Sequence, residues 1–151
     1  MAVAIRPALL HEQQVLQELQ RRASLANAGD REAILAHPDA IEIPLDQIVS
    51  GHVFVLESES TLAGFAAVLT RADGDAELDA LFVDPHLQRR GFGRSLVDHC
   101  AAIARIRGST ALYVIGNPHA QEFYLSCGFV SLRITETRFG PGLLMRRRLL
   151  P

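Results

Sequence analysis

A glycine-rich segment with several arginines is the part of this sequence best suited to bind a ligand. Gly91 and Gly93 follow Arg89 and Arg90, at the point where a helix is predicted to begin. The first turn of a helix presents backbone amides without intrahelical acceptors and a partial positive charge. Glycines let the backbone approach a ligand closely, and the arginines, together with Arg94, add positive charge. The segment therefore predicts a site for a diphosphate.

Two carboxylates precede this segment on a predicted strand. Glu77 and Asp79 are two positions apart, so their side chains point to the same face of the strand. Adjacent carboxylates raise the pKa of one of them, which moves it toward the range in which a general base works. The alternative is that both carboxylates are solvated or bind a cationic acceptor.

The spacing of the glycines differs from that of two well-known nucleotide loops. A dinucleotide-binding loop needs a third glycine and a turn directly after the strand. Leu96 occupies the place of that glycine, and residues 84–90 separate the strand from Gly91. The phosphate loop of NTPases ends in a lysine, whereas all 15 basic residues of this chain are arginines. By themselves, two glycines before a helix are also compatible with an ordinary helix start.

Two motifs resemble those of the GNAT (GCN5-related N-acetyltransferase) family. The segment Gln88-Arg89-Arg90-Gly91-Phe92-Gly93 resembles the family's Gln/Arg-x-x-Gly-x-Gly/Ala pyrophosphate loop. The segment from Asn117 to Phe129 resembles its Asn-x-x-Ala-x-x-x-Tyr/Phe-x-x-x-Gly-Phe motif, and the two occur in the family's order. The resemblance is strong over residues 61–130 and compatible with the whole chain. It implies an α/β fold with a central mixed, mostly antiparallel sheet flanked by helices, in a single domain over residues 1–151.

The resemblance also implies which residues contact acetyl-CoA, the co-substrate of that family. In the family, the fourth strand pairs with the pantetheine arm, and the loop amides hold the pyrophosphate. The implied cofactor-binding residues are Leu81, Phe82, Val83, Gln88, Arg89, Arg90, Gly91, Phe92, Gly93, Arg94, Ser95, Asn117, Ala120, Phe123 and Tyr124. The alternative role of Asn117 is to cap a loop.

Catalytic roles follow from the same resemblance. Tyr124 resembles the family's general acid, which protonates the departing CoA thiolate; its alternative is a half-buried helix tyrosine. Glu77 stands where histone-type members carry their catalytic glutamate and is the first candidate for the general base, with Asp79 as the second. Many members use water chains instead, so neither carboxylate need be essential.

The remaining sequence predicts the elements that position these residues. The sequence pattern of residues 41–51 is ambiguous and predicts no particular element. We expect Arg146–Arg148 to lie on a solvated edge strand. Strands are predicted at residues 2–6, 52–57, 61–69, 77–83, 111–115, 130–137 and 143–149, and helices at 9–23, 30–37, 91–107 and 118–127.

The composition argues against several classes of protein, including nucleic-acid-binding, membrane and secreted proteins. The chain has 151 residues, 48% of them hydrophobic, and a formal net charge of -2, which argues against a nucleic-acid partner. No apolar run approaches a membrane span, no secretion signal is evident, and Cys100 and Cys127 form no disulfide framework. We therefore expect a cytoplasmic protein without a membrane partner. The six histidines show no ligand spacing, so no metal is expected.

The sequence thus predicts an N-acetyltransferase that moves an acetyl group from acetyl-CoA directly to a primary amine. The acceptor is a small-molecule or protein amine, and the acidic pair at positions 77 and 79 mildly favours a cationic one. The alternatives are a non-catalytic acyl-CoA-binding sensor module and a nucleotide-binding regulator. Members of the family often dimerise, so the resemblance also allows a homodimer.

Overall fold

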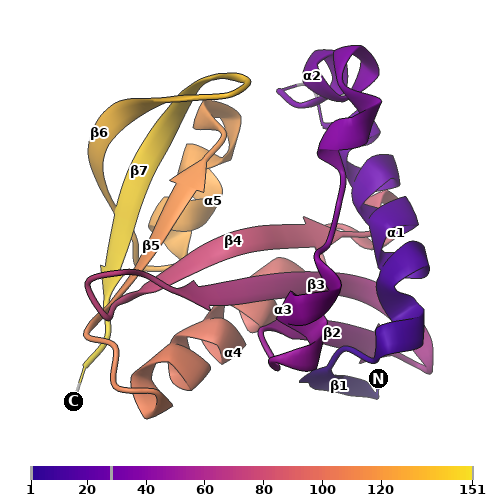
Figure 1. Ribbon diagram of the computed structural model, residues 1–151, viewed down its shortest axis with the longest axis horizontal. Coiled ribbons are helices and arrows are strands. Elements are labelled where there is room, and N and C mark those ends of the chain that lie inside the picture. Colours follow the sequence, from indigo (N-terminus) through magenta and orange to yellow (C-terminus); the bar gives the residue numbers. More distant parts are fainter. Residues whose placement is uncertain (1, 28, 151) are drawn as a thin grey trace. The chain divides into compact units, whose positions relative to one another are not determined.

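The computed structural model describes residues 2–27 and 29–150, and its strands form one mixed sheet (Figure 1). The strand order is β1-β2-β3-β4-β5-β7-β6. β4 and β5 are parallel, whereas β1–β2, β2–β3, β5–β7 and β6–β7 are antiparallel. This confirms the predicted mixed sheet flanked by helices. The strands are β1 (Val3–Pro7), β2 (Val53–Ser58), β3 (Thr61–Thr70), β4 (Ala76–Val83), β5 (Ala111–Gly116), β6 (Val130–Thr137) and β7 (Gly140–Arg148).

The contacts within the chain define two compact units, which we describe separately. The first unit comprises Met1–Ala67 and Ala80–Leu96, and the second comprises Val68–Asp79 and Val97–Pro151. The expectation of a single domain over the whole chain stays a prediction. The α-helices are α1 (Gln13–Ala26), α2 (Arg31–Ala36), α3 (Leu45–Val49), α4 (Phe92–Ile106) and α5 (Gln121–Ser126).

The core of the first unit forms where α1 and α3 pack on β2 and β3. Leu16 and Leu19 are three positions apart and therefore share one face of α1, and both are buried. They belong to one apolar cluster with Ile48, Val55 and Phe65. Each of these side chains contributes roughly 1.5–3 kcal/mol when it is removed from water. Apolar burial of this size outweighs the surface ion pairs of the unit, which contribute about 0–1 kcal/mol each.

One polar network of the first unit is partly buried. The Arg6 guanidinium on β1 donates to Glu12 at 2.7 Å and to Glu57 on β2 at 2.7 Å. The Leu9 amide also donates to the Glu12 carboxylate at 2.8 Å. The hydrogen bond from Arg6 is the main reason why the pKa of Glu12 lies below its ordinary value. This network joins β1, β2 and the start of α1 by charged hydrogen bonds.

The second unit is built around β5, which lies between β4 and β7. Val97, Cys100 and Ala104 recur at helical spacing on α4 and are buried. Leu112 and Met145 from the sheet are buried as well. Cys100 is fully buried, and this burial raises the pKa of its thiol to about 12. Cys127 is also buried and free of any disulfide.

The structure corrects one expectation about local elements and resolves one stretch that the sequence left ambiguous. α3 occupies Leu45–Val49, a stretch whose sequence pattern was ambiguous. β7 is not an edge strand, because it pairs with β5 on one side and β6 on the other. Arg147 faces away from its neighbours and donates to Asp98 on α4 at 2.7 Å and to the Cys127 carbonyl at 3.2 Å. Only long-range pairing determines which strand ends the sheet, so the arginine run alone could not indicate it.

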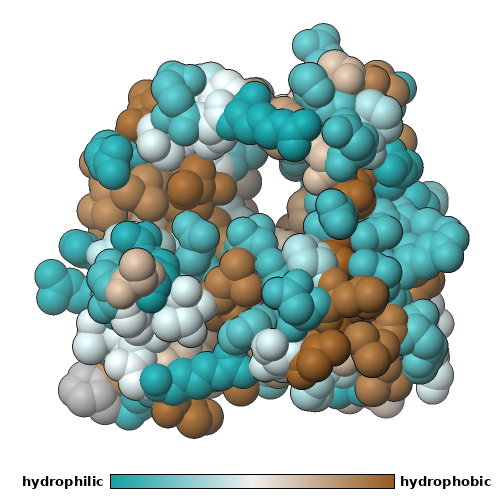
Figure 2. Space-filling view, in the orientation of Figure 1, coloured by the Kyte–Doolittle hydropathy of each residue, from teal (hydrophilic) through white to brown (hydrophobic). Residues whose placement is uncertain are grey.

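β6 is the strand at this edge of the sheet, and most of its residues are exposed. Val130, Leu132 and Ile134 are among its exposed apolar side chains. Brown, hydrophobic atoms gather over the region where Figure 1 draws β6 and β7, with hydrophilic side chains around them (Figure 2). In the part of the chain that the structure describes, no helix is long and apolar enough to cross a membrane.

Candidate functional site

The loop after β4 is held to the rest of the first unit by several hydrogen bonds. The Asp84 amide donates to the Ala63 carbonyl at 2.8 Å, and the Asp84 carboxylate accepts from the His86 amide at 3.0 Å. Arg22 on α1 pairs with the same carboxylate at 3.1 Å. The Gln88 side-chain amide donates to the Val83 carbonyl at 3.3 Å. The segment between the strand and the glycines therefore has a defined path.

The backbone of the glycine segment enters the left-handed region at two positions just before α4. Arg89 and Gly91 have positive φ angles of 64° and 79°. A Cβ added at Gly91 would meet nothing within 4 Å, so there is open space beside this backbone. The Ser95 amide donates to the Gly91 carbonyl at 3.0 Å, so the amides of the preceding residues belong to the first turn of α4.

The side chains around this helix start divide into two kinds. Phe92 and Leu96 are buried, so Phe92 can contact a ligand only through its backbone. Arg89, Arg90 and Arg94 are exposed, as are Gln88 and Ser95. The exposed guanidinium groups add positive charge to the partial charge of the helix start, and this arrangement fits a diphosphate.

β4 approaches β3 very closely just before this loop. A Cβ added at Gly64 on β3 would lie 2.8 Å from the Phe82 carbonyl oxygen and 3.4 Å from the Val83 Cα. The Phe82 ring packs against Phe65 with 5.6 Å between ring centroids. Leu81, Phe82 and Val83 are half-buried, so this end of β4 is partly accessible. The absence of a side chain at position 64 thus determines where the predicted pantetheine-binding backbone lies.

The carboxylate pair lies at the other end of β4, in the second unit. Burial raises the pKa of Glu77 above its ordinary value, and the nearby Asp79 carboxylate raises it further. Arg71 lowers the pKa of Glu77 to a smaller extent. The pKa of Asp79 is also raised, because surrounding protein removes part of its hydration, although the residue remains exposed. The pKa of Glu77 is therefore shifted upward, as the adjacent carboxylates predicted.

Two neighbours of Glu77 were missed from the sequence. Tyr113 on β5 pairs directly with Glu77, and the Arg71 guanidinium lies 3.9 Å from the centroid of the Tyr113 ring. Arg71 also pairs with Asp73 at 3.3 Å. Neither Arg71 nor Tyr113 belongs to a recognisable motif. The register between the parallel strands β4 and β5 places Tyr113 beside Glu77, and Arg71 directly follows β3.

The second motif forms a compact corner in the second unit. The Tyr124 ring is buried and makes edge-on contacts with Phe123 and Phe129, with centroids 5.1 and 5.5 Å away. A Cβ added at Gly116 would lie 3.0 Å from the Tyr124 ring, so the glycine leaves room for this side chain. The Asn117 side-chain oxygen Oδ1 accepts a hydrogen bond from the His119 backbone amide at 2.9 Å. Asn117 thus caps the turn before α5, which confirms the capping role and does not test the cofactor role.

The structure groups the predicted site residues within each unit. The diphosphate loop and residues 81–83 of β4 belong to the first unit, and the carboxylate pair belongs to the second with Asn117, Ala120 and Tyr124. Over residues 2–27 and 29–150, no three His, Cys, Asp or Glu side chains are arranged to hold a metal ion. The roles of the individual residues stay predictions.

Comparisons with known proteins agree with these motifs. Residues 15–129 match the sequence model described as "Acetyltransferase (GNAT) family". No curated protein sequence matches the chain.

Solved structures share the fold at low sequence identity. PaiA N-acetyltransferase from Thermoplasma acidophilum, in complex with coenzyme A, is 21% identical; 98% of this chain and 99% of that one align, with a TM-score of 0.76. The ribosomal-protein-S18-alanine N-acetyltransferase from Escherichia coli is 22% identical over 99% and 96% of the two chains, with a TM-score of 0.72. A putative acetyltransferase from Salmonella typhimurium with acetyl-CoA, yncA, is 22% identical over 100% and 96%, with a TM-score of 0.71.

Proposed function

This chain belongs to the acetyltransferase (GNAT) family and is accordingly an acetyl-CoA-dependent N-acetyltransferase, and we propose that it transfers the acetyl group directly to a primary amine. The observation that carries the proposal is the loop before α4. Its positive φ at Gly91, the open space beside it and the exposed arginines fit the pyrophosphate of acetyl-CoA. Two of the structural relatives were solved with CoA or acetyl-CoA, which supports the same co-substrate here.

We infer which residues bind each part of acetyl-CoA. The first-turn amides of α4, the side chains of Arg89, Arg90 and Arg94 and the side chains of Gln88 and Ser95 hold the pyrophosphate. The backbone of residues 81–83 pairs with the pantetheine arm, and Val83 or the residues before it donate to the thioester oxygen. Asn117, Ala120 and Phe123 contact the pantetheine from the second motif.

The proposed reaction needs proton transfers at both the amine nitrogen and the departing sulfur. The amine nitrogen of the acceptor attacks the thioester carbon, and the bond between that carbon and sulfur breaks. Before the attack, Glu77, or Asp79 in its place, takes one proton from the protonated amine, directly or through a water, and the proton that the nitrogen loses as the amide forms goes to solvent. Tyr124 donates a proton to the departing thiolate of CoA. The raised pKa of Glu77 supports its part, because a base is most effective when its pKa is close to the working pH.

The acceptor is proposed only as a class. One structural relative is named for an alanine of a ribosomal protein, and we propose a primary amine on a protein terminus or on a small molecule. The acidic pair on β4 favours an amine that arrives protonated. A cytoplasmic location and a homodimeric state stay predictions.

The proposal is tested first by calorimetric titration of acetyl-CoA into the purified protein and its Gly91→Asp variant. Aspartate places bulk and negative charge where the pyrophosphate should lie, so we expect micromolar binding by the wild type and none by the variant. Gly74→Asp is the matched control, because Gly74 has a similar φ of 88° and equally open surroundings but lies in the β3–β4 turn. No binding by the wild type would refute the acetyl-CoA site. Binding without acetylation of any amine in a broad panel would favour a sensor module.

A further inference from the structure

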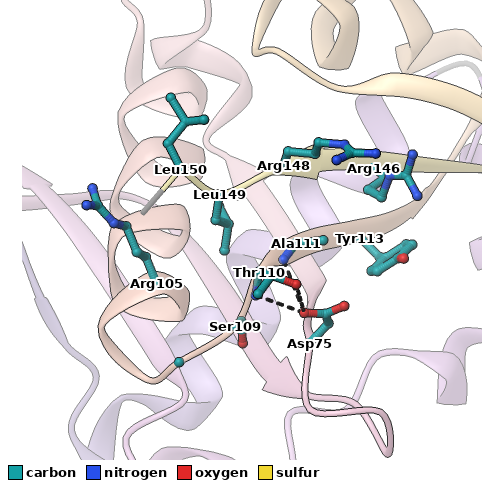
Figure 3. Close-up of a pocket in the computed structure, with 11 residues that line it drawn as sticks. Asp75, Arg105, Ser109, Thr110, Ala111, Tyr113, Arg146, Arg148, Leu149 and Leu150 are labelled. Atoms are coloured by element: carbon teal, nitrogen blue, oxygen red, sulfur yellow. Dashed lines mark hydrogen bonds between the residues drawn. The ribbon is translucent and has the colours of Figure 1, made fainter.

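A cavity lies in the second unit, and none of the residues assigned above to acetyl-CoA is among those that line it. It has a volume of about 670 Å³ and lies between the end of α4, the start of β5 and the end of β7 (Figure 3). Arg146 and Arg148 project from β7 side by side near Tyr113, and Arg105 lies on α4, on the other side of Leu149. Three of the residues that line this cavity are therefore arginines.

These arginines have no acidic partner. Arg105, Arg146 and Arg148 form no ion pair with any residue among 2–27 and 29–150. Arg147, between two of them on the opposite face of β7, is paired with Asp98. The Arg146 Nε atom is buried without a hydrogen-bond acceptor in the described part of the chain. A buried donor of this kind loses its hydration, so an acceptor supplied by a ligand would offset that cost.

The one carboxylate in the lining, that of Asp75, accepts hydrogen bonds from neighbouring residues instead of pairing with the arginines. Asp75 accepts hydrogen bonds from the Thr110 amide at 2.9 Å, the Thr110 hydroxyl at 3.0 Å and the Ala111 amide at 3.2 Å. These bonds hold the pKa of Asp75 below its ordinary value, so it is ionised at neutral pH. The Ser109 hydroxyl donates to the Gly74 carbonyl at 3.1 Å. Three arginines and one aspartate leave the lining with a charge of +2, carried by guanidinium groups that remain available.

The arrangement of these groups indicates the kind of anion. Arg146 and Arg148 are two positions apart on one strand face, which places their Cα atoms about 6.5 Å apart. Each guanidinium can hold a carboxylate or phosphate through two parallel hydrogen bonds. Ala111, Leu149 and Leu150 add an apolar wall. We propose that this cavity binds a small organic dianion, with its anionic groups on Arg146 and Arg148 and its hydrocarbon part against the apolar wall.

The dianion has two possible sources with the same chemistry. It can be a free metabolite, or it can be the anionic end of the acceptor itself. The second source has a structural basis, because Tyr113 pairs with Arg146 on one side and with Glu77 on the other. Residues paired in register point to the same sheet face, so the cavity and the proposed base share that face. Only this second source rests on the proposed function.

The test is calorimetric titration of succinate, with uncharged succinamide as the matched ligand. We expect succinate to bind in the micromolar to millimolar range and succinamide to show no heat. Arg146→Gln and Arg148→Gln should each weaken succinate binding by about tenfold or more. Arg147→Gln is the control, since it removes the same charge from the other face of β7 and should change binding less than twofold. Arg148 is exposed, so its variant remains informative if Arg146→Gln does not fold.

The two sources are separated by acetylation of 3-aminoglutarate, which carries two carboxylates, and of pentan-3-amine, which carries none. If the anionic groups belong to the acceptor, 3-aminoglutarate should have the lower KM, and Arg148→Gln should reduce the difference. If succinate binds while the two amines behave alike, the site belongs to a free anion. The proposal is overturned if succinate does not bind, whether or not inorganic phosphate does, or if Arg147→Gln weakens succinate binding as much as Arg148→Gln.

Discussion

Tyr124 combines a well-packed ring with the hydroxyl group that the proposed mechanism requires. Its ring contacts Phe123, Phe129 and the glycine at position 116, so phenylalanine can replace it without a cavity. Removal of a general acid slows the chemical step and leaves binding intact. We expect Tyr124→Phe to lower kcat by about 100-fold with little change in acetyl-CoA affinity. Steady-state kinetics and calorimetry check this, and an unchanged kcat would exclude Tyr124 as the acid.

Glu77 should impose a lower pH limit on the reaction. Its pKa is raised, so the carboxylate becomes protonated at a higher pH than an ordinary glutamate, and a protonated base accepts no proton. We therefore expect kcat to fall as the pH falls through this raised pKa. In Glu77→Gln, kcat should be lower by about 100-fold and should lose that acidic limb. The measurement is a pH–rate profile of both proteins.

Asp79→Asn serves as the control for this profile. Asp79 raises the pKa of Glu77 by its negative charge, so its removal should shift the acidic limb to lower pH while activity remains. If Glu77→Gln keeps the acidic limb, another group or a water chain is the base.

At the level of elements, the contact between β3 and β4 decides where the pantetheine-binding backbone lies. In Gly64→Ala, the new methyl group would lie 2.8 Å from the Phe82 carbonyl oxygen, and a backbone atom cannot move aside as a flexible side chain can. We expect a loss of about 1–3 kcal/mol in the free energy of unfolding, together with weaker acetyl-CoA binding. Denaturant unfolding and calorimetry measure the two effects.

A second glycine separates these two effects. Gly74→Ala introduces strain at a positive φ but meets no atom within 4 Å, so it should cost about 1–2 kcal/mol in stability. Its acetyl-CoA affinity should be unchanged. If Gly64→Ala and Gly74→Ala lose the same acetyl-CoA affinity, Gly64 does not act by setting the position of β4.

The sequence predicted features that lie within one short continuous segment and missed those that depend on contacts between distant segments. The glycine loop and the Tyr124 motif lie in short continuous segments, so residue type and spacing were sufficient to identify them. The start and end of most strands were predicted for the same reason, from turn residues such as Gly74. By contrast, the Glu77–Tyr113 pairing and the interior position of β7 depend on contacts between distant segments. Spacing along the chain carries no information about such pairings.

At the scale of the whole molecule, acid stability should depend on the Arg6 network of the first unit. The folded-state pKa of Glu12 lies below its ordinary value of 4.5, so this stabilisation is complete above that value and is lost as the pH falls through the folded pKa. Arg6→Gln leaves Glu12 buried without its guanidinium partner. We expect a loss of about 2 kcal/mol at pH 7 that shrinks steadily below about pH 4.

Denaturant unfolding at several pH values measures this difference. Arg21→Gln is the control, because Arg21 donates only to a backbone carbonyl, at 3.2 Å, and its loss should cost less than about 0.5 kcal/mol. A difference between the wild type and Arg6→Gln that persists undiminished at pH 3 would contradict the role assigned to Glu12.

Both cysteines of this chain are buried, and the pKa of the Cys100 thiol is raised to about 12. Thiolates react with disulfide dyes far faster than thiols do, and access to the sulfur is also required. The folded protein should therefore react only slowly with a chromogenic dye that detects free sulfhydryl groups. Release of the CoA sulfhydryl can then be followed continuously in the same cuvette, with little background from the enzyme. Hundreds of candidate amines become practical to screen without a labelled acetyl donor.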